Sequence, residues 1–236
     1  MILQSTIKKI RNKYFVAGSI ILFLTTLGSY LTGLWRDRIF AHTFGIGREL
    51  DIYNTSFIIP DLLLTIFVSS ALSPAFIPLF TSLVSQDKKE EANRLGSTII
   101  IGAIAIVIIL GTVAAICMPL IAPHIAPGFS ASEQAQLITY TRLLMISPIF
   151  IALSSALGGM LISYKNFIAY GISPILYNLG IVAGAYIGVR WGILGLVAGT
   201  LFGAMLHAVP RLIMMRKMPF RFLWGADFKD KNFLKV

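Results

Sequence analysis

The sequence predicts an all-α protein that crosses a membrane several times, and three observations support this prediction. The mean hydropathy is +0.81, and 56% of the residues are hydrophobic. Only 13% are charged, against about 25% in soluble globular domains. Six apolar stretches also reach the length that a helix needs to cross the hydrocarbon core while satisfying its own backbone hydrogen bonds.

The six predicted membrane spans cover residues 14–35, 52–84, 95–122, 136–164, 167–189 and 192–209. The first span contains no charged residue and follows a basic flank. Its apolar length exceeds the roughly 7–15 residues of a signal-peptide core, so we predict a retained helix. The third to sixth spans are long apolar runs. Asn178 in the fifth is predicted to form a hydrogen bond between helices.

The second predicted span is interrupted by Pro60 and Asp61, and further along by Pro74 and Pro78. A proline inside a helix removes one backbone hydrogen bond and kinks the helix. Kinked helices in transporters tend to line a cavity, where water or protein satisfies the freed backbone groups. We therefore predict that Pro60 is a hinge and that Asp61 faces a cavity, the simpler alternative being an ordinary proline kink.

The positions of the basic residues predict the orientation of the chain. If both ends are cytoplasmic, the inside segments hold fifteen lysine and arginine residues and the outside segments hold four. Cytoplasmic loops carry such an excess, so we predict a multi-pass membrane protein with both ends on the cytoplasmic side. The predicted organisation is a basic N-terminus (1–13), a six-helix lobe (14–210) and a basic cytoplasmic segment (211–236).

Other function classes find no support in the sequence. The net charge of +10 lies in short segments between apolar runs and not in a basic stripe, which argues against nucleic-acid binding. No cysteine and histidine cluster has metal-ligand spacing, and no glycine-rich phosphate loop follows a strand, so no metal or cofactor is expected. No acid, base and nucleophile occur at a recognisable spacing, so an integral-membrane enzyme is the least favoured class.

One polar stretch between the first two spans, WRDRIFAHTFGIGRELD at 35–51, opposes the charge rule. It holds three of the four outside arginines, Arg36, Arg38 and Arg48. An arginine near the membrane stays ionised and offers a planar fork of donors that suits phosphate or carboxylate oxygens. The cluster is therefore a candidate site for an anionic headgroup. The alternative is that these arginines reach the interface or pair with neighbouring aspartates.

Asp51 ends this stretch, directly before the second span. Its simplest role is that of a helix N-cap, whose carboxylate accepts from the first free backbone N–H groups. The alternative is that Asp51 acts as a titratable or cation-linked switch near Arg36. On that interpretation Asp51 and Asp61 are candidates for gating or for counter-charge.

Four separated motifs occur along the chain: RDRIFAHTFGIGRELDIYNTSFIIPDLL, ALSPAFIPLF, APGF and GGMLISYKNFIAYGISPILYNLGIV. In their order and spacing, over about residues 25–190, they resemble the MurJ/MviN lipid II flippase family. That family belongs to the multidrug/oligosaccharidyl-lipid/polysaccharide exporter superfamily. Several motifs in order make a more specific resemblance than any one of them.

The resemblance implies a fourteen-helix transporter with two six-helix lobes and a cavity that opens alternately to each side. It implies a flippase that moves an undecaprenyl-diphosphate-linked glycan lipid, the peptidoglycan precursor, across the bacterial cytoplasmic membrane. The expected drive is the membrane potential or an ion gradient. The family's motif arginine falls on Arg36 and its aspartate on Asp51. Arg36 would then attract the diphosphate, with Arg38 and Arg48 adding positive field.

The sequence departs from the family at three cavity cations, whose places hold Tyr30, Leu64 and Thr65. Arg38 is a candidate to replace part of that charge. The chain also ends after one lobe, in a segment that resembles the interlobe linker, so we expect a fragment. Its expected partners are the lipid-linked glycan, membrane lipids and a C-terminal lobe from the same or another chain. Two alternatives stay open: a multidrug or polysaccharide exporter of this superfamily, and a non-transporting membrane scaffold derived from such a lobe.

Overall fold

The computed structural model describes residues 2–45, 47–66 and 75–235, and the side chains of these ranges from residue 16 to residue 234. The described residues fold into helices joined by turns, without a strand, which confirms the all-α prediction. The elements are α1 (Ile2–Thr43), α2 (Arg48–Thr55), α3 (Ile58–Leu64), α4 (Ile77–Ser85), α5 (Lys89–Ile125), α6 (Ala131–Leu144), α7 (Ser147–Ser163), α8 (Phe167–Trp191), α9 (Ile193–Met215) and the 3-10 helix η3 (Phe233–Lys235).

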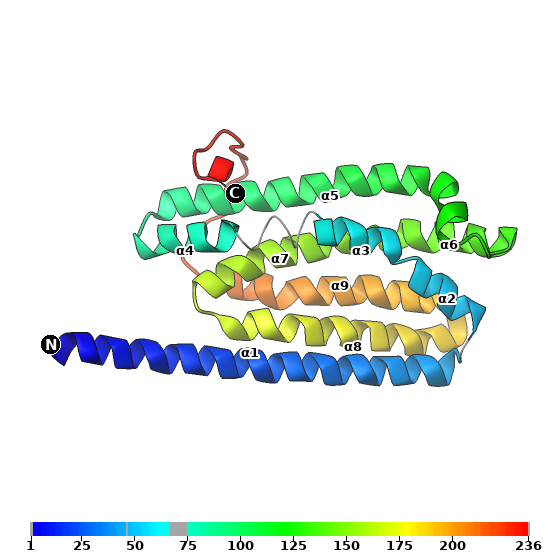
Figure 1. Cartoon of the computed structure of the whole chain (residues 1–236), viewed down its shortest axis with the longest axis horizontal. Helices are drawn as coiled ribbons and strands as arrows, with labels where there is room; N and C mark the ends of the chain where they lie inside the picture. Colours follow the sequence, from blue (N-terminus) through cyan, green and yellow to red (C-terminus); the bar gives the residue numbers. More distant parts are fainter. Residues whose placement is uncertain (1, 46, 67–74, 236) are drawn as a thin grey trace.

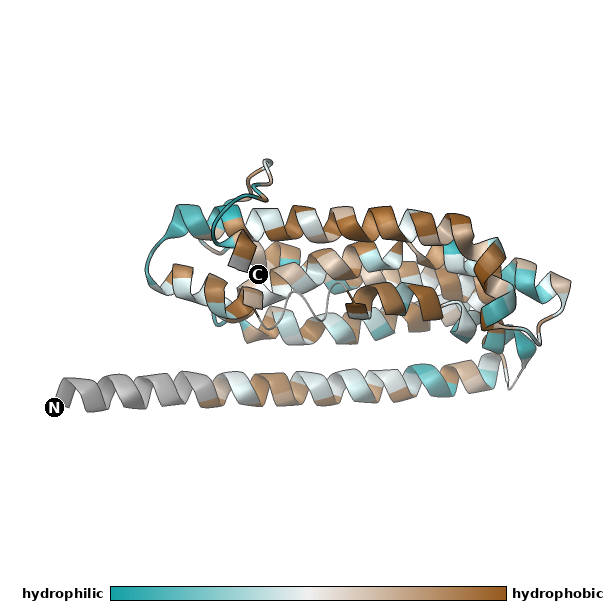
Figure 2. Cartoon of the chain, turned by 45° about the horizontal axis from the view of Figure 1, so that its top comes forward, coloured by the Kyte–Doolittle hydropathy of each residue, from teal (hydrophilic) through white to brown (hydrophobic). Residues whose placement is uncertain are grey.

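The long helices lie side by side in the order α1, α8, α9, α7 and α5 (Figure 1). Both chain ends lie toward the same end of this bundle, where the turn between α4 and α5 is also found (Figure 1). Figure 2 shows hydrophobic residues along the middle of the long helices and hydrophilic residues gathered toward the two ends of the bundle. This distribution is typical of a helical bundle that spans a bilayer.

Within the described ranges, five stretches are long and apolar enough to cross a membrane. They are Val16–Thr43, Lys89–Ile125, Ala131–Ser163, Phe167–Trp191 and Ile193–Met215. They correspond to the first and to the third to sixth predicted spans, so the protein is a multi-pass membrane protein. In the stretch formed by α6 and α7, Pro148 has no N–H for the carbonyl of Leu144, and Ser147 Oγ donates to that oxygen at 2.8 Å instead.

The second predicted span, 52–84, is interrupted near Pro60, as the sequence indicated. Its described residues form the helices α2, α3 and α4, a turn at 56–57 and short π-helical stretches at 65–66 and 75–76, while Pro74 lies outside the described ranges. Pro78 occupies the first turn of α4. Proline is tolerated there because the N–H that it lacks would have no partner within the helix. Pro78 therefore lies at the start of α4.

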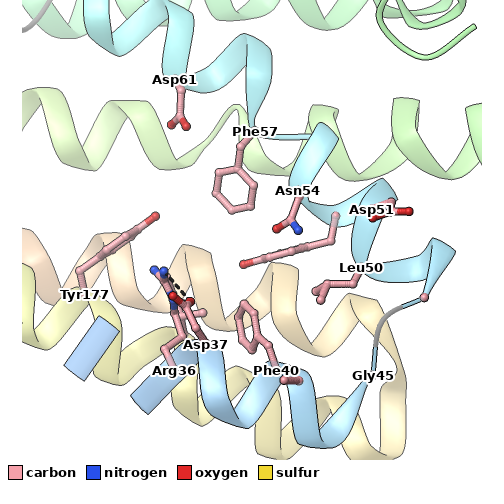
Figure 3. A pocket seen from close by; sticks show the side chains of 14 residues that line it. Arg36, Asp37, Phe40, Gly45, Leu50, Asp51, Asn54, Phe57, Asp61 and Tyr177 are labelled. Atoms are coloured by element: carbon pink, nitrogen blue, oxygen red, sulfur yellow. Dashed lines mark hydrogen bonds and ion pairs between the residues drawn. The ribbon is translucent and has the colours of Figure 1, made fainter. Parts of the chain in front are cut away.

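The break between α2 and α3 lies one turn before Pro60. α2 ends at Thr55, and α3 begins at Ile58 after a short turn. In an unbroken helix the N–H of residue 60 would bond the carbonyl of Ser56, and proline cannot make that bond. The buried hydroxyl of Ser56 donates to the carbonyl of Tyr53 at 2.6 Å. The kink expected at Pro60 is thus a complete interruption, and α2 and α3 take separate directions (Figure 3).

α8 and α9 form the closest helix pair of the bundle because glycines face one another across it. The facing pairs are Gly180 with Gly203, Gly184 with Gly199 and Gly188 with Gly195. A Cβ added at five of the six would collide with the backbone of the opposite helix, and a Cβ added at Gly188 would meet the ring of Phe44. Small residues spaced four apart allow two membrane helices to approach closely and to gain van der Waals contact, which is the main source of their association in lipid.

α9 continues past the predicted end of the lobe to Met215, and this places Arg211 inside the bundle. The Arg211 side chain, expected in a cytoplasmic segment, is 4% exposed. Its guanidinium donates to Ser173 Oγ at 3.0 Å, to the carbonyl of Ser154 at 2.8 Å and to the carbonyl of Tyr170 at 3.0 Å. Arg211 therefore fastens α9 to α7 and α8, a role that the charge pattern did not predict.

The segment that follows α9, residues 216–235, lies along the N-terminal half of α5. Three of its backbone N–H groups donate to polar side chains of α5: Arg221 to Asn93 Oδ1 (3.0 Å), Leu223 to Ser97 Oγ (2.9 Å) and Asp227 to Thr98 Oγ1 (3.0 Å). Ser97 and Thr98 are fully buried under this segment. The basic segment is therefore docked on the lobe.

Candidate functional site

A cavity of about 650 Å³ opens between α1, α2, α3 and α8 (Figure 3). Its lining residues are Arg36, Asp37, Phe40, Ala41, Gly45, Gly47, Leu50, Asp51, Tyr53, Asn54, Phe57, Asp61, Tyr177 and Ile181. Most of them come from the polar stretch that the sequence singled out or from the broken second span. The cavity therefore joins two features that were predicted separately.

Arg36 lies on the α1 wall and is held from two sides. Its Nε donates to Asp37 Oδ1 at 2.9 Å, and its Nη2 lies 2.8 Å from the same oxygen. Its Nη1 donates to Asn178 Oδ1 in α8 at 3.0 Å. The side chain is 29% exposed, so the guanidinium is fixed in direction but still reaches the cavity.

Asn178 connects α8 with α1, which confirms its predicted role as a hydrogen-bonding residue between helices. Its Nδ2 donates to the carbonyl of Ser29 at 3.1 Å, while its Oδ1 accepts from Arg36. A buried amide at a helix interface costs free energy unless its groups are paired. Here the same amide pairs with the backbone of α1 and with the arginine that lines the cavity.

Asp61 lies on the wall opposite Arg36 (Figure 3). It is in the first turn of α3, and its carboxylate points into the space between α3 and the α1–α8 pair. Among the described residues it forms no ion pair. The hydroxyl end of Tyr177 lies between the two charged groups in the same view. The prediction that Asp61 faces a cavity agrees with this position, while its gating role stays a prediction.

Asp51 lines the cavity but does not cap the second helix, which corrects the simplest interpretation of this residue. The N-cap of α2 is Gly47, and Asp51 lies within the first turn of the helix. Its N–H donates to the carbonyl of Gly47 at 3.2 Å. The helix starts earlier than the apolar run because Glu49 and Asp51 are favourable in a first turn, where the helix dipole is positive. The carboxylate of Asp51 is therefore free of a capping role.

Arg38 and Arg48 lie outside this cavity, although the sequence placed them in the same cluster as Arg36. Arg38 lines a separate pocket with Trp35, His42 and Tyr186. Residues two apart on a helix project to nearly opposite sides, so Arg36 and Arg38 of α1 cannot face the same space. The structure does not place Arg38 where it could replace missing cavity charge.

Arg48 instead joins the start of α2 to the start of α6. Its Nε donates to Glu133 Oε1 at 3.1 Å, and its Nη2 donates to the carbonyl of Gly128 at 2.8 Å. Its guanidinium also lies 4.9 Å from the ring centroid of Phe129. Glu133 in turn accepts from the N–H of Ser130 in a capping box at the start of α6. Arg48 is therefore committed to a structural contact.

The residues that line the cavity carry a net negative formal charge. The lining residues include one arginine and three aspartates: Arg36, Asp37, Asp51 and Asp61. The lobe alone therefore offers an anion one fixed guanidinium among several carboxylates.

Two tyrosines in the lining were not singled out in the sequence. Tyr53 is buried, and its hydroxyl lies 2.7 Å from Thr200 Oγ1, which ties α2 to α9. Tyr177 projects from α8 into the cavity (Figure 3). Its neighbour Asn178 was noticed because an amide is rare in an apolar run, whereas tyrosine is common in membrane helices and gives no such signal.

The fold and the cavity define the chain as one helical lobe of a membrane transporter. A solved multidrug resistance MATE family transporter of the MOP superfamily, in an outward-facing conformation, shares this fold. It matches with a TM-score of 0.71 at 17% identity, over 94% of this chain and 49% of that one. A likeness at this identity concerns the fold alone.

A family model described as lipid II flippase MurJ matches residues 40–236, and the chain belongs to this family. A solved lipid II flippase MurJ in an inward closed conformation matches with a TM-score of 0.75 at 26% identity, over 92% of this chain and 45% of that one. A probable lipid II flippase MurJ of Rickettsia prowazekii is 32% identical over 71% of this chain and 33% of its own length. The chain thus spans less than half the length of these relatives.

Proposed function

We propose that the chain is the N-terminal lobe of a lipid II flippase that works by alternating access. Its substrate is the undecaprenyl-diphosphate-linked peptidoglycan precursor, which moves to the outer leaflet of the bacterial cytoplasmic membrane. Membership of the family supports this proposal. The main structural support for a headgroup site is the fixed guanidinium of Arg36, which faces a cavity lined in part by the broken second span.

Arg36 has donors to spare for a diphosphate. Asp37 and Asn178 engage three of its five N–H groups. Phosphate oxygens accept well from a guanidinium because its donors are planar and its charge persists at any physiological pH. The surrounding contacts hold the fork in place, so less side-chain entropy is lost when an anion binds.

The carboxylates of Asp51 and Asp61 would repel a diphosphate that enters this lobe alone. We infer that a second lobe supplies positive charge to the same cavity and that the two aspartates act as counter-charges when the substrate is absent. Electrostatic attraction between the aspartates and those cations would favour closure of the empty cavity. The break at Pro60 would let α3 move relative to α2 during that change. This assigns gating to the aspartates and hinge motion to Pro60.

The test is a lipid II flipping assay, or complementation of a flippase-depleted strain, with variants of the full-length protein. Arg36→Ala should lower the rate about 10- to 100-fold, the range expected for loss of hydrogen bonds to a charged group. Arg36→Lys should fall between, because the charge stays but the fork is lost. Arg38→Ala is the matched control, since Arg38 lies two residues away and outside the cavity. Full activity of both Arg36 variants would refute the headgroup role.

One observation favours a second candidate, the export of amphipathic cations. The cavity wall is negatively charged and carries the aromatic rings of Phe40, Tyr53, Phe57 and Tyr177, and such rings attract organic cations. The two functions differ in the ligand that stabilises the purified full-length protein. A rise in melting temperature with undecaprenyl diphosphate supports the flippase, whereas a rise with amphipathic cations alone supports the exporter.

A further inference from the structure

A second cavity, of about 500 Å³, lies between α5, α7, α9 and the segment after α9. Its lining is almost entirely apolar: Ile100, Ile104, Leu153, Leu157, Leu212, Met215, Arg216, Phe220, Phe222 and Trp224. It shares no lining residue with the candidate functional site, which is formed by α1, α2, α3 and α8. We call it the rear groove.

Hydrogen bonds fix one wall of the rear groove. The N–H groups of Arg221 and Leu223 donate to side chains of α5 at 3.0 Å and 2.9 Å. These bonds alternate with Phe220 and Phe222, whose rings turn toward the groove. Gly96 of α5 leaves space for Phe220, because a Cβ added there would lie 2.8 Å from the ring. The groove is thus built by the fold and is not a chance gap between helices.

The lining of the rear groove includes one basic residue. This residue is Arg216, and Lys217 and Arg221 lie close by in the same segment. All three side chains are exposed, and none forms an ion pair with another described residue. Trp224 stands at the lip of the groove with 91% of its surface exposed. Tryptophan and arginine gather at the depth of the lipid headgroups, where an apolar body meets a polar surface.

We propose that the rear groove binds an anionic phospholipid, with one acyl chain along the apolar wall and the phosphate at Arg216. Basic pockets between membrane helices on the cytoplasmic side are suited to acidic headgroups because the local charge is complementary and the chain avoids water. The unpaired cations select an anionic headgroup over a zwitterionic one. The site is separate from the cavity proposed for the transported lipid, and by the charge rule it faces the inner leaflet.

The test compares the binding of phosphatidylglycerol and phosphatidylcholine to the full-length protein in detergent by native mass spectrometry. The unaltered protein should bind phosphatidylglycerol more tightly. Arg216→Gln should weaken that binding about fivefold, the effect of one basic residue near a lipid surface, and should leave phosphatidylcholine binding unchanged. Arg190→Gln is the matched control, because Arg190 is an exposed arginine at the last turn of α8, outside the groove.

A second variant tests the apolar wall. Ile104→Trp should fill part of the groove and weaken the binding of both phospholipids. Equal affinity for the two phospholipids in the unaltered protein would overturn the proposal. An Arg216→Gln protein that behaves like Arg190→Gln would do the same. A third outcome would also overturn the proposal. If equimolar undecaprenyl diphosphate displaces phosphatidylglycerol, and Ile104→Trp abolishes this displacement, the groove binds the transported lipid.

Discussion

Asn178 of α8 accepts a hydrogen bond from Arg36 of α1 at 3.0 Å, across 142 positions of the chain. The same amide donates to the backbone of α1 at Ser29. The contact that joins the two helices therefore also sets the direction of the arginine in the candidate site. Packing and charge placement depend on one side chain here, so a change at Asn178 should affect both.

Asn178→Leu should lower stability because it removes the hydrogen bonds of the amide to Arg36, Ser29 and Thr32 while keeping a similar volume. Hydrogen bonds between membrane helices contribute about 0.6 kcal/mol each on average, so the expected loss in the free energy of unfolding is about 1–2 kcal/mol. The same variant should reduce flipping, since Arg36 loses one of its two anchors. Unfolding in denaturant and a flipping assay measure the two effects. Normal stability together with normal flipping would show that the contact carries neither role.

Pro60→Ala should reduce transport because it restores the N–H that completes the helical ladder to Ser56. A continuous helix would turn Asp61 away from its position opposite Arg36. Pro78→Ala is the control: Pro78 lies in the first turn of α4, where its N–H is not required. A flipping assay with the full-length protein measures transport by both variants. Equal transport rates would show that the break between α2 and α3 is not needed for transport.

Arg211→Met should lower the free energy of unfolding by about 1–3 kcal/mol, because carbonyl groups of α7 and α8 lose their donors inside the bundle. Gly158→Ala should act in the same direction, since the added Cβ would lie 2.6 Å from Arg211 Nη1. Arg216→Met, at an exposed arginine, should change stability by less than about 0.5 kcal/mol. Chemical denaturation of the three variants tests the order, and an equal effect of Arg211→Met and Arg216→Met would contradict it.

Gly184→Ala should destabilise the α8–α9 pair because the new methyl group meets the backbone of Gly199. Overpacking of this kind costs about 1–3 kcal/mol. Gly225→Ala is a matched control, as no atom lies within 4 Å of a Cβ added at that position. Thermal unfolding of the purified variants compares them. If Gly184→Ala and Gly225→Ala have the same melting temperature, α8 and α9 accommodate the added methyl group without loss of stability, and the prediction is wrong.

Much of the fold could be predicted from the sequence. The first and the third to sixth spans were identified from the sequence, because a membrane helix is recognised from its own composition alone. Their ends were placed less well, since the first continues to Thr43 and the last to Met215. The interruption near Pro60 was also expected, since the missing N–H is a property of that residue. The extent of the break was not, because the separate directions of α2 and α3 depend on what each helix packs against.

The candidate site was predicted in part. Arg36, Asp51 and Asp61 do meet at one cavity, while Arg38 and Arg48 do not join them. A cluster of charged residues in the sequence shows only that they are close along the chain. Helix geometry turns the side chains of positions 36 and 38 to nearly opposite sides of α1. The start of α6 supplies Glu133 to Arg48, and no local sequence pattern indicates a partner 85 positions away.

The sequence by itself determined that the protein crosses the membrane repeatedly and to which family it belongs, because hydropathy and motif order are local properties of the chain. The tertiary structure decided which charges face the cavity, that its wall is net negative, and that Arg211 is buried among α7, α8 and α9. The physical reason is that burial and pairing depend on side chains brought together from distant helices. The sequence around an arginine at the end of an apolar run is the same whether its N–H groups donate to water or to buried carbonyl oxygens.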